Sequence, residues 1–244
     1  RLPENLIHVD TEASIVARTY APKVAIYADA ADTARRLGSL LAGHRAPEDW
    51  AHQAAGARDA VVAGARELIG PDYRAIMDSI RAHLPDGGAV VRDATTAAYY
   101  WADNLLTVRE PRTSIHPGAA AIGPGLPLAL GAVAATGERG VVIHGDGGIM
   151  LTIPELATLA QHELPLTVCV FNDHGYGILR DIQSATFPGA RHDVDLLTPD
   201  FVSLAQSMGV QAQRVGTAAD FDAAFERSVS AAGPVLIEVD MRSL

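Results

Sequence analysis

The sequence predicts an α/β fold in which a parallel sheet is covered by helices on both faces. Three observations predict it. Short apolar runs, such as residues 141–144 and 166–171, alternate with longer segments of helical pattern. These runs are continuous rather than alternately polar, as is typical of strands buried on both sides. Glycine-containing turns separate the two kinds of segment, and 48% of the residues are hydrophobic, which suits an ordinary globular protein.

The first 43 residues predict the end of an α/β unit. We expect strands at residues 5–9 and 24–27 and helices at residues 11–20 and 30–41. So short a segment does not close a core of its own, so we expect the chain to be the carboxyl-terminal piece of a longer polypeptide. Residues 44–84 are then a linker with two leading helices, at residues 48–69 and 73–83, after a proline-containing break at residues 44–49.

Residues 85–244 are expected to form one domain. Its strands are predicted at residues 89–92, 141–144, 166–171, 211–215 and 235–239. Helices are predicted to end at Trp101 and to span residues 125–135, 153–162, 201–208 and 219–231, with a loop over residues 114–123. Pro71 occupies the first turn of the helix before this domain, where a missing backbone N–H costs nothing.

Composition argues against several classes of protein. The net charge is −10 and no basic cluster exceeds Arg35–Arg36, which excludes a nucleic-acid partner. The single cysteine, Cys169, lies in an apolar run, so we expect a buried residue, no internal disulfide and a cytoplasmic location. The uncharged stretch 115–137 carries three prolines and five glycines, which favours a loop and a buried helix over a membrane span.

Polar residues follow three of the predicted strands. The three sets are Asp93 with Thr95 and Thr96, the Gly-Asp-Gly-Gly of residues 145–148, and the Asn-Asp-His-Gly of residues 172–175. Each set taken alone is an ordinary turn. Because parallel strands end at the same edge of a sheet, we expect the three sets to meet there.

The two aspartates in these sets point to a metal ion. Asp146 and Asp173 are 27 residues apart, room for one helix and one strand, so both lie at the same edge. Glycine backbone at a helix start favours phosphate. Carboxylates beside a phosphate need a cation between them, and Mg²⁺ binds through carboxylates plus substrate phosphates. The pattern therefore predicts a Mg²⁺–diphosphate site.

The spacing of Gly-Asp-Gly and Asn-Asp resembles the cofactor fingerprint of thiamine diphosphate enzymes. It is most similar to the acetohydroxyacid (acetolactate) synthase and benzoylformate decarboxylase group, which has Asn-Asn at the second place. The resemblance covers the whole chain. Residues 85–244 resemble the family's diphosphate-binding domain, and residues 1–43 resemble the end of its Rossmann-like central domain. It implies thiamine diphosphate and Mg²⁺ as cofactors and leaves FAD open for the parent enzyme.

The resemblance also assigns roles to residues. The implied Mg²⁺ ligands are Asp146, Asp173 and the backbone carbonyl of Gly175. The implied cofactor-binding residues are Thr95, Thr96, Ala120, Ile122, Gly145, Asp146, Gly147, Gly148, Asp173, Gly175 and Tyr176. In this set Ile122 would wedge the cofactor into its bent form and the Ala120 carbonyl would meet its pyrimidine amino group. The implied substrate-pocket residues are His116, Ile178, Leu179 and Ile182.

Three positions depart from patterns within this family. Asp173 stands where the family has Asn, which keeps an oxygen donor and adds a negative charge. Leu179 stands where yeast-type pyruvate decarboxylases carry a catalytic Glu. Ile182 stands where acetohydroxyacid synthases commonly carry a Trp that selects the second substrate, which puts synthase activity in doubt. No catalytic residue is assigned to this chain, because the family's activating Glu belongs to an amino-terminal pyrimidine-binding domain.

The implied reaction is decarboxylation of a 2-oxo acid, with carboligation as in acetolactate synthase. The alternatives are a benzoylformate-type decarboxylase without carboligation, a two-chain 2-oxo-acid dehydrogenase or transketolase, and a non-catalytic phosphate- or nucleotide-binding module. The resemblance implies a homodimer or homotetramer that includes the pyrimidine-binding domain. We expect neither nucleic acid nor membrane as a partner, and we expect the chain alone to be inactive.

Overall fold

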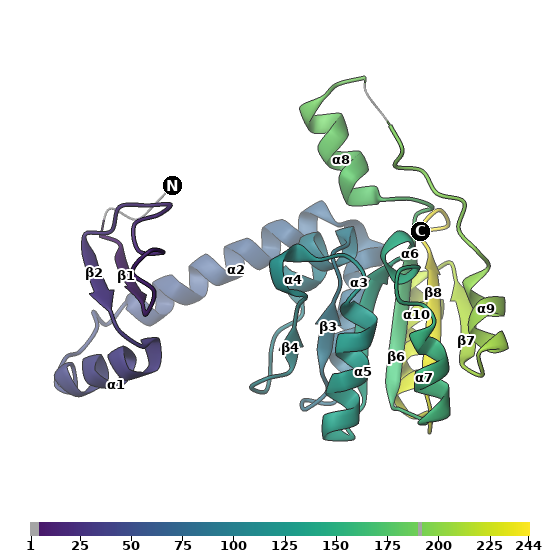
Figure 1. Cartoon of the computed structure of the whole chain (residues 1–244), viewed down its shortest axis with the longest axis horizontal. Helices are drawn as coiled ribbons and strands as arrows, with labels where there is room; N and C mark the ends of the chain where they lie inside the picture. Colours follow the sequence, from purple (N-terminus) through teal and green to yellow (C-terminus); the bar gives the residue numbers. More distant parts are fainter. Residues whose placement is uncertain (1–4, 190–191) are drawn as a thin grey trace. The chain divides into compact units, whose positions relative to one another are not determined.

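The computed structural model describes residues 5–189 and 192–244, and the chain divides into two compact units (Figure 1). The units are Arg1–Gly56 and Ala57–Leu244. The helix α2 (Trp50–Leu68) contains the point of division. The predicted domain boundaries near residues 43 and 84 stay predictions.

The described residues of the first unit form a two-stranded parallel sheet, a complete helix and the first residues of α2. The strands are β1 (Ile7–Asp10) and β2 (Val24–Tyr27), and the helix is α1 (Ala30–Leu40). Asp29 caps α1, because its side chain accepts a hydrogen bond of 2.9 Å from the Asp32 N–H.

The helix predicted at residues 11–20 is wrong, because these residues form turns. Two side chains compete with the helical hydrogen bonds: Asp10 accepts from the Glu12 N–H at 2.8 Å, and Glu12 accepts from Ser14. Ala17 has a φ of 65°, which lies outside the right-handed helical region.

The second unit is built on a six-stranded parallel sheet with the order β4-β3-β5-β6-β8-β7. The strands are β3 (Val90–Arg92), β4 (Ser114–Ile115), β5 (Gly140–Gly145), β6 (Leu166–Asn172), β7 (Gln211–Val215) and β8 (Val235–Asp240). The longer helices are α3 (Gly70–His83), α5 (Gly125–Thr136), α7 (Glu155–Gln161), α8 (Gly177–Thr186), α9 (Phe201–Ser207) and α10 (Ala218–Val229). The parallel sheet and its helices confirm the predicted fold class.

Two apolar cores, one on each face of the sheet, hold the second unit together. Ile143 of β5 faces a core that includes residues of α3 and α10, whereas its neighbour Val142 faces residues of α5, α7 and α9. Both side chains are completely buried, and so is Cys169, as its apolar surroundings predicted. Because neighbouring strand residues point to opposite faces, a strand covered on both sides is apolar throughout.

Short elements that the sequence did not predict surround the carboxyl edge of the sheet. Residues 114–115, predicted as loop, pair with β3 as the edge strand β4. The Gly-Asp-Gly turn begins a one-turn helix, α6 (Asp146–Ile149). The helix predicted to end at Trp101 is a π-helix (Ala97–Ala102) that continues into α4 (Asp103–Leu105). These pieces bring backbone close to the ends of β3, β5 and β6.

Among the described residues, no helix is both long and apolar enough to cross a membrane.

Replacing Ile143 by Ala tests the two-core arrangement. This side chain is fully buried in the central strand β5, so Ile143→Ala is expected to lower the free energy of unfolding by about 2 to 5 kcal/mol. The matched control is Ile182→Ala, which truncates a half-exposed isoleucine and should change it by less than about 0.5 kcal/mol. Urea unfolding followed by circular dichroism measures both, and equal losses would contradict the assignment of Ile143 to the core.

Candidate functional site

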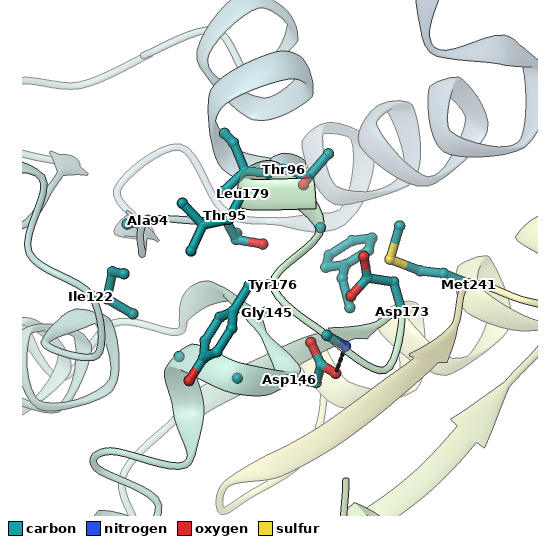
Figure 2. Close-up of a pocket in the computed structure, with 16 residues that line it drawn as sticks. Ala94, Thr95, Thr96, Ile122, Gly145, Asp146, Asp173, Tyr176, Leu179 and Met241 are labelled. Atoms are coloured by element: carbon teal, nitrogen blue, oxygen red, sulfur yellow. Dashed lines mark hydrogen bonds between the residues drawn. The ribbon is translucent and has the colours of Figure 1, made fainter. Parts of the chain in front are cut away.

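A pocket opens where β3, β5 and β6 end (Figure 2). It contains most of the predicted cofactor-binding residues. Its lining consists of Ala94, Thr95, Thr96, Ile122, Gly145, Asp146, Gly147, Gly148, Phe171, Asp173, Gly175, Tyr176, Gly177, Ile178, Leu179 and Met241. The three polar sets that follow different strands in the sequence therefore contribute to one pocket, as their places at the ends of parallel strands predicted.

Asp146 lies at the base of this pocket and is almost completely buried. It begins α6, and its Oδ2 accepts a hydrogen bond of 2.8 Å from the backbone N–H of Gly175 (dashed in Figure 2). This bond joins the turn after β5 to the turn after β6. Burial, and then the negative charge of Asp173, raise the pKa of Asp146 to about 7.

Asp173 faces the same space from the neighbouring strand end (Figure 2). Burial raises its pKa, while the nearby Arg180 and a hydrogen bond with the Asp146 side chain act in the opposite direction. Asp146 therefore retains a proton in part at pH 7, with the Asp173 carboxylate beside it. A divalent cation could replace that proton, because it would stabilise both charged forms at once.

Arg180 is a functional candidate that the sequence analysis missed. Its Nη1 lies 3.2 Å from Asp173 Oδ2, and its Nη2 lies 3.3 Å from Asp195 Oδ1. It comes from α8, seven residues after Asp173. The added charge at position 173 was the available signal, because a partly buried second carboxylate calls for a cationic neighbour.

The predicted phosphate-binding hydroxyls lie against glycine backbone. A Cβ at Gly145 would lie 2.7 Å from Thr95 Oγ1, and one at Gly177 would collide with Asp173 and lie 3.2 Å from Thr96 Oγ1. Glycine is therefore required at both positions for this close approach. The cradle fits a diphosphate beside a cation, because it combines two hydroxyls, the amino-terminal end of α6 and two carboxylates.

The loop before α5 brings Ile122 to the pocket and leaves Ala120 outside its lining. Ala119 and Ala120 both have left-handed φ values, 54° and 55°, which are uncommon for residues with a Cβ. Ile122 is 43% exposed, and its Cγ2 would lie 3.4 Å from a Cβ at Gly148. The residue predicted as the cofactor wedge therefore lies above α6 with its side chain accessible.

Asp93 points into the protein rather than into the pocket that its neighbours Thr95 and Thr96 line. Its carboxylate accepts hydrogen bonds from the backbone N–H groups of Gly123 and Gly125. His144 Nδ1 lies 3.4 Å from Asp93 Oδ2, and both side chains are fully buried. Burial lowers the pKa of His144 to about 4, so its imidazole is neutral at pH 7.

The predicted substrate residues divide into two groups. Ile178 and Leu179, at the start of α8, line the pocket. Ile182, one turn later, is 51% exposed and lies outside the lining. His116 also lies outside it, with its Nε2 3.8 Å from Asp103 Oδ1. Met241, which follows β8, lines the pocket and was not predicted, although the end of a neighbouring strand was the place to look.

The described parts of the chain hold no group of three or more His, Cys, Asp or Glu side chains arranged for a metal ion. Asp146 and Asp173 alone would contribute two carboxylates. This donor set suits Mg²⁺, which is commonly held by one or two carboxylates and takes further ligands from phosphate and water.

A family model described as "Thiamine pyrophosphate enzyme, C-terminal TPP binding domain" matches residues 94–239, more than half of the chain. The chain belongs to the thiamine pyrophosphate enzyme family. The matched region begins just after β3 and ends within β8, so it contains all the residues that line the pocket apart from Met241.

Its relatives within the family include acetolactate synthases. The chain is 35% identical over 143 residues to the mitochondrial acetolactate synthase catalytic subunit of Saccharomyces cerevisiae, over 58% of this chain and 21% of that protein. It is 27% identical to the chloroplastic acetolactate synthase 2 of Zea mays, over 96% of this chain and 39% of that protein. The chain therefore spans no more than about two fifths of the length of these relatives.

A thiamine diphosphate-dependent 4-hydroxybenzoylformate decarboxylase from Rhodococcus jostii RHA1 has a similar structure. The TM-score is 0.76 with 26% identity, over 97% of this chain and 44% of that one. A benzoylformate decarboxylase from Polynucleobacter necessarius, at 19% identity and a TM-score of 0.65, shares the fold over 70% of this chain.

Metal-free protein is expected to become less stable as the pH rises from about 5 to about 8. The pKa of Asp146 is raised to about 7 in the folded chain, so the folded state holds a proton that the unfolded state has already released. That stabilisation is complete at low pH and is lost as the pH rises through 7. Asp173→Asn removes the neighbouring charge and should flatten this dependence. Melting temperatures measured in EDTA across this range test it, and an equal slope in both proteins would contradict it.

Proposed function

We propose that this chain provides the diphosphate and Mg²⁺ part of the active site of an enzyme that decarboxylates a 2-oxo acid with thiamine diphosphate. The observation that carries the proposal is the meeting of Asp146 and Asp173 in one pocket beside the hydroxyls of Thr95 and Thr96. Membership of the thiamine pyrophosphate family supports the cofactor, and the two-carboxylate donor set supports Mg²⁺.

In this proposal each group of the chain has a separate task. Asp146, Asp173 and the Gly175 carbonyl hold Mg²⁺, and Thr95, Thr96 and the amides that begin α6 hold the diphosphate. Thiamine diphosphate, when bound, supplies a carbon nucleophile and an acceptor for the electron pair released with CO₂. Ile122, Ile178 and Leu179 add apolar surface that keeps water from the reacting end of the pocket.

The Asp173–Arg180 pair supports a metal site that tolerates aspartate in place of asparagine. An aspartate ligand brings one more negative charge to a site that already receives a diphosphate. Arg180, 3.2 Å from Asp173, supplies a compensating positive charge from α8. Arg180 also lies 3.3 Å from Asp195, so it offsets the charge of Asp173 in part.

Carboligation in the manner of acetolactate synthase is the first candidate for the fate of the decarboxylated fragment, because several relatives carry that name. Release of an aldehyde without carboligation is the second. It is favoured by the small aliphatic Ile182, where the synthase pattern has Trp, and by the likeness to a 4-hydroxybenzoylformate decarboxylase. The products formed from a single 2-oxo acid, an aldehyde or a 2-hydroxy-2-acyl acid, separate the two.

We further propose that catalysis needs a pyrimidine-binding domain and a homo-oligomeric assembly. No glutamate lines the pocket described here, so the activating glutamate of this family would come from another domain. FAD in the parent enzyme is left open by this proposal.

Thiamine diphosphate with Mg²⁺ is expected to raise the melting temperature of the 244-residue chain by about 5 to 10 °C at a ligand concentration of about 100 Kd. ATP or FMN with Mg²⁺ should leave it unchanged, and EDTA should remove the effect of thiamine diphosphate. Asp146→Asn should abolish the shift because it removes a metal ligand, whereas Asp181→Asn, which changes an exposed aspartate on α8, should preserve it. Equal stabilisation by ATP would instead favour a nucleotide-binding module.

The 244-residue chain alone is expected to release no CO₂ from pyruvate, 2-oxobutyrate or benzoylformate. The same chain joined to its pyrimidine-binding domain should decarboxylate at least one of them, because the activating carboxylate is then present. A coupled aldehyde assay and chromatography of acyl products measure the two outcomes. Robust turnover by the isolated chain would contradict the proposed division of the active site between domains.

A further inference from the structure

The loop that carries Ile122 is attached to the interior of the protein by one buried carboxylate. Asp93 Oδ1 and Oδ2 lie 3.0 and 2.9 Å from the backbone nitrogen of Gly123, and Oδ1 lies 3.0 Å from that of Gly125. Burying a carboxylate raises the free energy of the folded state unless hydrogen bonds replace those with water. Hydrogen bonds to a charged acceptor are stronger than those between neutral groups. The negative charge of Asp93 therefore draws the backbone on both sides of Pro124 inward.

His144 and two glycines close the space around this carboxylate. His144 precedes the Gly-Asp-Gly turn, and its Nδ1 lies 3.4 Å from Asp93 Oδ2. A Cβ at Gly125 would lie 2.8 Å from His144 Nε2, and a Cβ at Gly148 would lie 2.7 Å from Asp93 Oδ2. Asp93 thus packs between the loop on one side and α6 on the other, with no room for a side chain at Gly125 or Gly148.

We propose that Asp93, enclosed by His144, is a positioning residue that sets the place of Ile122 over the pocket and so controls binding of the thiamine part of the cofactor. The inference rests on the proposed function and adds a residue that touches no ligand. It separates the site into two parts. The diphosphate part depends on Thr95, Thr96 and α6, and the thiamine part depends on a loop held by Asp93.

A second, weaker attachment of the same loop provides an internal comparison. Thr152 Oγ1 donates a hydrogen bond of 2.8 Å to the Gly123 carbonyl, and this hydroxyl is partly buried and neutral. Hydrogen bonds to a charged group contribute more than neutral ones. If loop position is set by the carboxylate, removing the Thr152 hydroxyl should have a smaller effect than removing the charge of Asp93.

The test compares two probes, thiamine diphosphate and inorganic pyrophosphate, each titrated with Mg²⁺ into the 244-residue chain by calorimetry. Asp93→Asn should weaken thiamine diphosphate binding about tenfold and change pyrophosphate binding by less than about twofold. Thr95→Val, which alters the diphosphate part, should weaken both probes equally. Thr152→Val should weaken thiamine diphosphate less than Asp93→Asn does.

A double variant shows whether Asp93 acts through Ile122. Ile122→Ala should weaken thiamine diphosphate selectively, and adding Asp93→Asn should cost little more, because both changes remove the same contact. If Asp93→Asn does not fold, His144→Asn, which leaves both carboxylate oxygens in place, should give the same selective loss to a smaller degree.

Three results would overturn the inference in distinguishable ways. Equal weakening of both probes by Asp93→Asn, or an effect additive with Ile122→Ala, would show a general structural role and overturn the inference alone. Wild-type chain that binds neither probe would overturn the proposed function, and the inference with it.

Discussion

The partial removal from water of two neighbouring carboxylates at adjacent strand ends is the constraint on which the site depends. Strands β5 and β6 are parallel and in register up to Gly145 and Phe171, so the residues that follow them reach the same edge together. Asp146 and Asp173 then share one pocket. Burial is the main cause of the raised pKa of each, and the negative charge of Asp173 adds to the shift of Asp146. A cation bound to both carboxylates would stabilise their charged forms, and the parallel sheet brings the two carboxylates to one place.

The same edge of the sheet explains which features were predictable from sequence. Continuous apolar runs identify strands covered on both faces, and the 27 residues between Asp146 and Asp173 leave space for one helix and one strand between them. These are local patterns with a single geometric solution in a parallel sheet. They predicted the fold and brought the three polar sets to one pocket without knowledge of any long-range contact.

Features that depend on long-range contacts were not predictable in this way. The Asp93 carboxylate points toward the backbone N–H groups of Gly123 and Gly125, 30 and 32 residues later in the chain. Its sequence neighbours Thr95 and Thr96 line the pocket and therefore do not indicate this direction. The role of Arg180 depends on the course of α8, and β4 is a strand because β3 is there to pair with it. The predicted helix at residues 11–20 failed for a local reason, the competition of Asp10 and Glu12 with backbone bonds.

Three aspartates near the pocket show how the partners of a carboxylate decide whether it binds a ligand or positions a loop. Asp146 is exposed to the negative charge of Asp173 in the same pocket, where both carboxylates are available to a cation. Asp93 is as buried as Asp146, whereas Asp173 is only partly buried. Asp93 accepts hydrogen bonds from backbone N–H groups of a loop and faces a neutral imidazole, so its carboxylate holds that loop. Aspartates one strand apart therefore have different roles, because Asp146 faces a second carboxylate in an open pocket, whereas Asp93 is enclosed by the loop and His144.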